Sequence, residues 1–130
     1  METSSGRVLV VDDDADIRAL VARRVRSEGH AVIDVGSGAE ALTAVDERGA
    51  PDVAVLDVSM PGMDGLELLE TLRQKEGLAH LPAIFLSARV QQSDVERGRS
   101  MGAVYLTKPF IASALLRAIT DALTPADESW

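Results

Sequence analysis

The chain has 130 residues, which is enough for one domain of ordinary size but not for two. Its 21 acidic and 13 basic residues give a net charge of −8 with neutral histidines, which argues against direct nucleic-acid binding, because phosphates are neutralised by Lys and Arg. The lack of cysteine excludes disulfides and thiolate sites, and no apolar run approaches the ~18 residues of a membrane span. We expect one acidic, cytoplasmic domain over residues 7–123, with flexible tails at 1–6 and 124–130 and no membrane insertion.

Short apolar runs rich in Val, Ile and Leu alternate with longer segments of helical periodicity. Such short, continuously apolar runs are typical of strands in a parallel sheet that helices cover on both faces. In chain order, the pattern predicts strand Val8–Val11, helix Ala15–Glu28, strand Ala31–Val35, helix Gly38–Arg48, strand Val53–Leu56, helix Asp64–Lys75, strand Ala83–Leu86, helix Gln91–Met101, strand Ala103–Leu106 and helix Ile111–Leu123. The alternation predicts a three-layer α/β fold with a doubly wound parallel sheet.

The last two predicted helices have an unusual composition. Between Ile111 and Leu123 only Arg117 and Asp121 are charged, so the apolar surface is wider than one buried face needs. Either part of this surface meets a partner or a second copy, or the alanines serve helix propensity alone. Ile111 has no side-chain oxygen to cap its helix, and Gly98 is expected to weaken the preceding helix by ~1 kcal/mol relative to Ala.

Polar side chains follow four of the predicted strands. They are Asp12, Asp13, Asp57, Ser87 and, two residues beyond the fifth strand, Lys108. The carboxyl ends of parallel strands open onto one edge of the sheet, where ligands bind, so we expect these side chains to meet in one cleft. Lysine occurs twice against eleven arginines, and a lysine at this position therefore indicates a need for a compact point charge.

Three carboxylates in one cleft oppose each other's ionisation, and a cation would relieve their repulsion. Oxygen ligands favour Mg²⁺, with Mn²⁺ as a substitute, and neither histidine follows a predicted strand. A carboxylate nucleophile, a divalent cation, a hydroxyl and an ammonium group are together what phosphoryl transfer requires. The sequence therefore predicts chemistry on a phosphoryl group.

The acidic run after the first strand could also begin a helix or form a calcium loop. For Asp14 and Asp16 we favour helix capping and the positive end of the helix dipole. An EF-hand calcium loop is rejected because its sixth position is Ile17 instead of Gly and its twelfth is Arg23 instead of Glu. Helix capping accounts for at most one of the adjacent acids Asp12 and Asp13, so both remain candidates for a metal site.

Four motifs, in this order, resemble the receiver domains of two-component response regulators, the CheY-like proteins. They are VLVVDDD at 8–14, VLDVSMPGMDG at 55–65, LSA at 86–88 and YLTKPF at 105–110. The resemblance covers Arg7–Leu123 and implies a flavodoxin-like (βα)5 fold with strand order 2-1-3-4-5. It also implies a cis peptide bond between Lys108 and Pro109.

The resemblance implies a metal and phosphoryl site. Asp57 would be the phosphoacceptor, and Mg²⁺ would be ligated by Asp13, Asp57 and the backbone carbonyl of Ser59. Asp12 would act on the metal through water.

The resemblance also implies residues that respond to the phosphoryl group. Ser87 would bond a phosphoryl oxygen, Lys108 would pair with the phosphoryl group, and Tyr105 would be an aromatic switch that follows Ser87. Ser59 and Arg89, each near a site residue in the sequence, would tune the lifetime of the acyl phosphate.

The partners implied are a sensor histidine kinase or a histidine phosphotransfer protein. Activation would reshape the face formed by segments 91–101, 103–106 and 111–123, through which the chain would meet an effector or form a homodimer. The chain would not be an enzyme beyond catalysing its own phosphoryl uptake and autodephosphorylation.

Three alternatives compete with this interpretation. A flavodoxin-like nucleotide-binding protein is disfavoured because acids follow the first strand where a phosphate loop needs Ser, Thr or Gly. A haloacid dehalogenase phosphatase is disfavoured because Ser59 stands where its second Asp would be. A degenerate receiver that acts as a constitutive interaction module remains, although every expected site residue is present.

Overall fold

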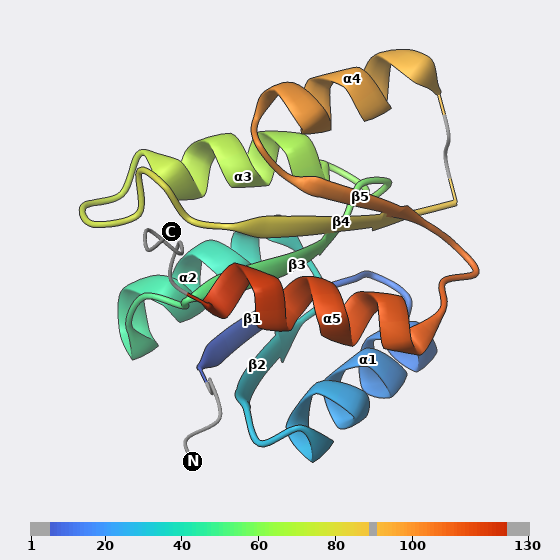
Figure 1. The fold of residues 1–130 in the computed structure, drawn as a ribbon. Coiled ribbons are helices and arrows are strands. Elements are labelled where there is room, and N and C mark those ends of the chain that lie inside the picture. The colour runs from blue at the N-terminus through green and yellow to red at the C-terminus, as the bar shows by residue number, and fades with distance from the viewer. Residues whose placement is uncertain (1–5, 89–90, 125–130) are drawn as a thin grey trace, which may run out of the picture.

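Strands and helices alternate along the whole described chain, and they form a sheet covered by helices on both faces (Figure 1). The structure is a computed structural model that describes residues 6–88 and 91–124. The elements are β1 (Arg7–Val11), α1 (Ala15–Ser27), β2 (Ala31–Val35), α2 (Gly38–Arg48), β3 (Val53–Asp57), α3 (Gly65–Arg73), β4 (Ala83–Ser87), α4 (Gln92–Ser100), β5 (Val104–Thr107) and α5 (Ala112–Leu123). Each lies where the sequence predicted an element: β2 and α2 have the predicted bounds, and the ends of the others differ by at most two residues.

The five strands are parallel and lie in the order β2-β1-β3-β4-β5. This is the doubly wound sheet that the sequence predicted. The chain runs outward from β1 to β2 and returns to β3, so β1 and β3 flank the point where the winding direction reverses. Val11 pairs with Leu56 in the register of these two strands, and the residues that follow them are therefore neighbours.

The core has two layers, one on each face of the sheet. On one face, α2 and α3 pack on the sheet with residues such as Ala41, Leu66 and Phe85. On the other face, α1 and α5 pack on it with residues such as Val25 and Ile119. Strands β1, β3 and β4 lie between the two layers and are almost completely buried, which agrees with their apolar sequences; the polar residues Arg7, Asp57 and Ser87 lie only at their ends.

Side-chain caps determine where several helices begin. Asp14 accepts hydrogen bonds from the N–H groups of Asp16 and Ile17, which confirms the capping role predicted for this acid. Asp64 caps α3 in a reciprocal capping box with Glu67, so the helix begins one residue later than predicted. Each cap satisfies N–H groups that have no partner within the helix.

In the two helices of unusual composition, α4 and α5, only Gly98 has a role that the sequence did not predict. Gly98 is buried, and a Cβ there would lie 3.2 Å from ring carbons of both Phe85 and Tyr105. The glycine therefore allows α4 to approach the sheet closely, in addition to lowering helix propensity. At the start of α5, Ile111 makes no side-chain cap hydrogen bond, as expected, and it is 70% exposed.

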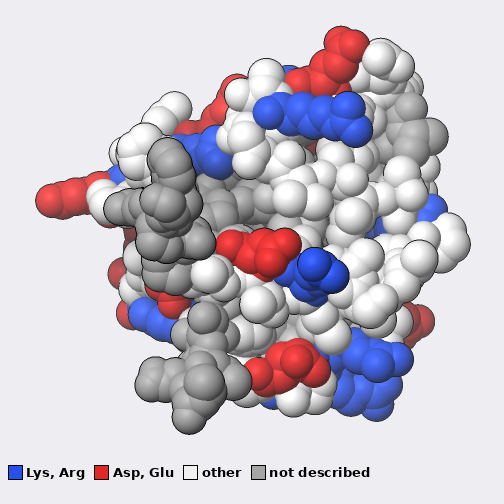
Figure 2. All heavy atoms as spheres, viewed as in Figure 1, with Lys and Arg blue, Asp and Glu red and all other residues white. Residues whose placement is uncertain are grey.

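The face that carries α5 has charged side chains of both signs, with uncharged atoms covering much of the area over β5 and α5 (Figure 2). Leu115 and Ile119 of α5 are buried, whereas Leu116 and Ala118 are only partly buried against the core. A groove beside β5 and α5 is lined by residues that include Val104 and Ala118. Within residues 6–88 and 91–124, no helix is long and apolar enough to cross a membrane.

The predicted tails lie almost entirely outside the described residues. Gly6 and Thr124 are described, and both make hydrogen bonds: the Gly6 N–H donates to His30 Nδ1, and the Thr124 hydroxyl donates to the Thr120 carbonyl. The domain limits 7–123 and the flexibility of the tails remain predictions.

Candidate functional site

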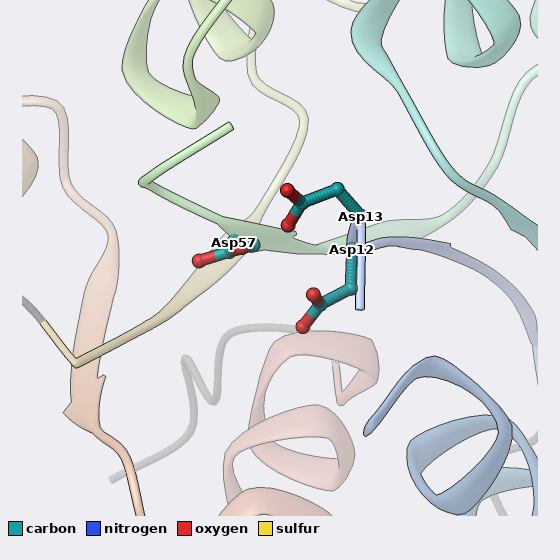
Figure 3. Close-up of side chains that lie close together, drawn as sticks. All are labelled: Asp12, Asp13 and Asp57. Atoms are coloured by element: carbon teal, nitrogen blue, oxygen red, sulfur yellow. The ribbon is translucent and has the colours of Figure 1, made fainter. Parts of the chain in front are cut away.

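Three aspartates meet at the carboxyl ends of β1 and β3. Carboxylate oxygens of Asp12, Asp13 and Asp57 all lie within 4.8 Å of one another. Asp12 and Asp13 leave the end of β1 in different directions, with Asp57 beside them on β3 (Figure 3). Asp12 and Asp57 are only 3% and 5% exposed, whereas Asp13 is exposed. The convergence predicted from strand ends is therefore present.

Lys108 reaches this group from the loop after β5. Its Nζ lies 2.9 Å from Asp12 Oδ2 and 3.6 Å from Asp57 Oδ1. The Lys108 N–H donates to the carbonyl of Ser87 at 2.8 Å, which fixes the loop beside the end of β4. The Lys108–Pro109 peptide bond is cis, as the resemblance implied.

Backbone groups hold the acidic residues in place. The Asp12 N–H donates to the Val35 carbonyl at 3.2 Å, and Asp12 Oδ1 accepts the N–H of Asp14 at 2.9 Å. Asp57 Oδ1 accepts the N–H of Ser59 at 3.3 Å. The two buried carboxylates are therefore oriented before any ligand binds.

The charges in the cleft perturb one another. The pKa of Asp57 is raised to about 7, first because the carboxyl is buried and then because of the charge of Asp12. A hydrogen bond with Asp13 acts in the same direction, and Lys108 and the Ser59 N–H act against it. Burial alone would lower the pKa of Lys108, but Asp12 and Asp57 outweigh it and the pKa is raised, so the lysine stays cationic.

This donor set fits a hard divalent cation. It consists of closely spaced carboxylates from two adjacent strands, with one exposed member at the mouth of the cleft. Three carboxylates face one lysine here, and the pKa of Asp57 stays raised through its burial and through the charge of Asp12. An oxygen-ligand cation such as Mg²⁺ or Mn²⁺ would supply the missing positive charge.

The other predicted site residues lie around this cleft or on the strands beside it. Ser87 is fully buried at the end of β4, directly after Leu86, which pairs with Asp57 of β3. Tyr105 lies on β5, half-buried, with its ring centroid 6.1 Å from that of Phe85. Ser59 is exposed, two residues after Asp57. Arg89 lies outside the described residues.

Two residues that shape the cleft were not predicted from the sequence. Gly65 begins α3, and a Cβ there would collide with the Asp57 carbonyl oxygen, so only glycine fits. Its position directly after the Asp64 cap is the weak sequence signal that could have indicated it. The other is Arg18, whose Nη1 donates to the Asp12 carbonyl at 2.8 Å.

Comparison with known proteins agrees with this geometry. The family model for the response regulator receiver domain matches residues 8–120. The chain belongs to this receiver domain family. The flavodoxin-like alternative is set aside by this match, since the family and the positions of its acids agree.

Two curated relatives illustrate the similarity. The DNA-binding response regulator MtrA of Mycobacterium tuberculosis is 36% identical over 129 residues, which cover 98% of this chain and 55% of the relative. The transcriptional regulatory protein PrrA of the same species is 40% identical over 117 residues, covering 89% of this chain and 49% of the relative. This receiver domain thus spans about half the length of the curated relatives it matches.

Solved structures show the same fold. The response regulator 1452 receiver domain of Francisella has a TM-score of 0.80 and 32% identity, covering 91% of this chain and 96% of that chain. The chemotaxis protein CheY4 of Vibrio cholerae has a TM-score of 0.81 and 30% identity, covering 91% of this chain and 98% of that chain. Both match across nearly the whole receiver domain.

Proposed function

We propose that this receiver domain takes up a phosphoryl group on Asp57 from the phosphohistidine of a sensor histidine kinase or a histidine phosphotransfer protein. One observation carries the proposal: a buried aspartate lies among two further carboxylates and a lysine at the carboxyl edge of the sheet. Small acyl phosphates are donors of the same chemical class. The donors are made in the cytoplasm, and the proposal therefore includes a cytoplasmic location.

In the proposed reaction, a carboxylate oxygen of Asp57 attacks the phosphorus of the donor. The new bond is P–O, and the bond that breaks is the donor's P–N or P–O bond, whose electron pair leaves with the imidazole or carboxylate. Asp57 must be ionised to attack, and Lys108, 3.6 Å from Asp57 Oδ1, favours that ionised form. The Lys108 ammonium then pairs with a phosphoryl oxygen.

Asp13, Asp57 and the Ser59 carbonyl would hold Mg²⁺, or Mn²⁺ as a substitute, with Asp12 acting through water. When bound, the cation neutralises charge on the phosphoryl oxygens. Asp12 and Lys108, which are paired at 2.9 Å, would keep the cleft oriented. Ser59 and Arg89 would tune hydrolysis of the acyl phosphate, so the domain would catalyse only its own phosphoryl uptake and loss.

The output would pass through Ser87 and Tyr105 to the face of α4, β5 and α5. Ser87 would bond a phosphoryl oxygen, and Tyr105 would change rotamer with it. This two-state change would alter binding of an effector or a second copy on that face. MtrA is described as DNA-binding, and the acidic charge of this chain supports the view that such contacts would not come from this receiver domain.

Intact-mass measurement tests the proposal. The protein is incubated with Mg²⁺ and acetyl phosphate, and in parallel with a cognate histidine kinase and ATP, and we expect a gain of one phosphoryl mass. Asp57→Asn should abolish the gain, whereas Asp46→Asn on the surface of α2 should leave it unchanged. No gain with either donor would support a degenerate receiver, and a gain that survives Asp57→Asn would contradict the assignment of the phosphoacceptor.

A further inference from the structure

Arg18 of α1 connects the acidic loop after β1 to the edge strand of the sheet. Its Nη1 donates a hydrogen bond to the Asp12 carbonyl at 2.8 Å, and its Nε lies 3.5 Å from Asp34 Oδ2 on β2. The Arg18 side chain is only 24% exposed. A guanidinium has a rigid planar arrangement of donors, so two contacts at different nitrogens fix its orientation.

The loop after β2 leaves room for this guanidinium. A Cβ at Gly36 would lie 2.9 Å from Arg18 Nη1, which is too close for any other residue without a shift. The Gly36 N–H donates to Glu40 Oε1 at 2.9 Å, which holds the loop in this position. Arg18 is therefore enclosed by the β1–α1 loop, by β2 and by the β2–α2 loop.

The group that Arg18 holds is part of the peptide unit between two site residues. The Asp12 carbonyl and the Asp13 N–H belong to one planar unit, so the direction of this carbonyl sets where Asp13 leaves the strand end. Asp12 is also held through its carboxylate by Lys108 and the Asp14 N–H. Asp13 is exposed, so its position relative to Asp57 depends on this peptide plane more directly than the position of Asp12 does.

We propose that Arg18, oriented by Asp34, is a positioning residue that sets the Asp12–Asp13 peptide plane and thereby the spacing of the cation ligands. The inference rests on the proposed function, because the spacing matters only if these carboxylates bind a cation. Outer contacts that orient metal ligands typically change metal affinity by 10–100-fold when removed.

Charge and positioning give opposite expectations, which makes the inference testable. Removing a positive charge near three carboxylates should strengthen cation binding by simple electrostatics. Loss of positioning should weaken it. With Arg18→Gln, we expect Mg²⁺ affinity, measured calorimetrically on metal-free protein without any phosphoryl donor, to fall about tenfold. Arg18→Lys keeps the charge but cannot make both contacts from one planar group. It should recover at most part of the Mg²⁺ affinity that Arg18→Gln loses.

Arg26→Gln is the matched control. Arg26 also pairs with Asp34, through Nη2 and Oδ1 at 3.2 Å, and its other contact is the Val32 carbonyl. Its replacement should leave Mg²⁺ affinity within twofold of the wild type. Asp34→Asn, which leaves Arg18 in place but weakens its orientation, should lower the affinity by an intermediate factor and serves if Arg18→Gln does not fold.

Each outcome is decisive. Unchanged or tighter Mg²⁺ binding by folded Arg18→Gln, checked by its urea midpoint, would overturn the inference while leaving the proposed function intact. A wild-type protein that binds no Mg²⁺ would instead contradict the proposed metal site itself. Equal weakening by Arg18→Gln and Arg26→Gln would mean that a general loss of stability, and not the contact with the Asp12 carbonyl, is responsible, and it would also overturn the inference.

Discussion

Lys108 makes its closer ion pair with Asp12, at 2.9 Å, although the two residues are 96 positions apart in the chain. The contact with Asp57, the proposed phosphoacceptor, is longer at 3.6 Å. The lysine thus bridges two buried carboxylates from different strands. In the proposed reaction it already lies within reach of a phosphoryl group on Asp57.

The first prediction compares the two lysines of the chain. Lys108→Met leaves two buried carboxylates without their cation, and we expect the free energy of unfolding of the metal-free protein to fall by about 2–3 kcal/mol at pH 8. Lys75→Met removes a surface pair with Asp46 and should cost less than about 1 kcal/mol. Urea denaturation in the presence of a chelator measures both, and equal costs would contradict the structural account of Lys108.

The second prediction concerns metal affinity and pH. A cation must displace the proton from Asp57, whose pKa is about 7 in the metal-free protein. The ionised fraction falls about tenfold from pH 8 to pH 6, so Mg²⁺ affinity should fall by about the same factor. Calorimetric titration at pH 6, 7 and 8 checks this. A constant affinity across the range would show that Asp57 is ionised throughout and that its raised pKa is wrong.

The third prediction concerns stability and pH. The pKa of Asp57 is higher in the folded state than its ordinary value of 3.8, so between about pH 4 and 7 the folded state binds more protons than the unfolded state. Stability of the metal-free protein should therefore fall through this site as pH rises across that window. Asp57→Asn removes the effect, so the variant should be more stable than wild type at pH 8, with a smaller difference at pH 5.

The control for this measurement is Asp46→Asn, an exposed carboxylate on α2. Its free energy of unfolding in urea should follow that of the wild type at both pH values to within about 0.5 kcal/mol. If Asp57→Asn were no more stable than wild type at pH 8, the raised pKa that burial and Asp12 give to Asp57 would be wrong.

The fourth prediction separates two glycines that follow Asp57 in the sequence. Gly65→Ala places a Cβ against the Asp57 carbonyl oxygen, and the backbone must move, so we expect a loss of about 3 kcal/mol. Gly62 has a φ of 79° with open space around it, so Gly62→Ala meets only backbone strain of about 1 kcal/mol. Thermal unfolding of the two variants measures the difference. A smaller loss for Gly65→Ala than for Gly62→Ala would contradict the close approach of α3 to β3.

The sequence alone determined the order of the elements and which residues end the strands. Apolar runs such as Val53–Leu56 are local features, and a polar residue directly after such a run is visible without a structure. Because parallel strands point in one direction, their carboxyl ends share an edge, and Asp12, Asp13 and Asp57 could be brought together by topology alone. Lys108 was identifiable because lysine is rare in this chain.

Only the tertiary structure decided which partners these residues take. Arginine and lysine side chains have many rotamers, so sequence spacing does not indicate that Arg18 contacts the Asp12 carbonyl or that Lys108 lies closer to Asp12 than to Asp57. Gly98 could be read only as a weak helix former until Phe85 and Tyr105 were seen to pack against it. Such choices depend on distances between elements that are remote in sequence. Periodicity and composition describe each element by itself, and they carry no information about those distances.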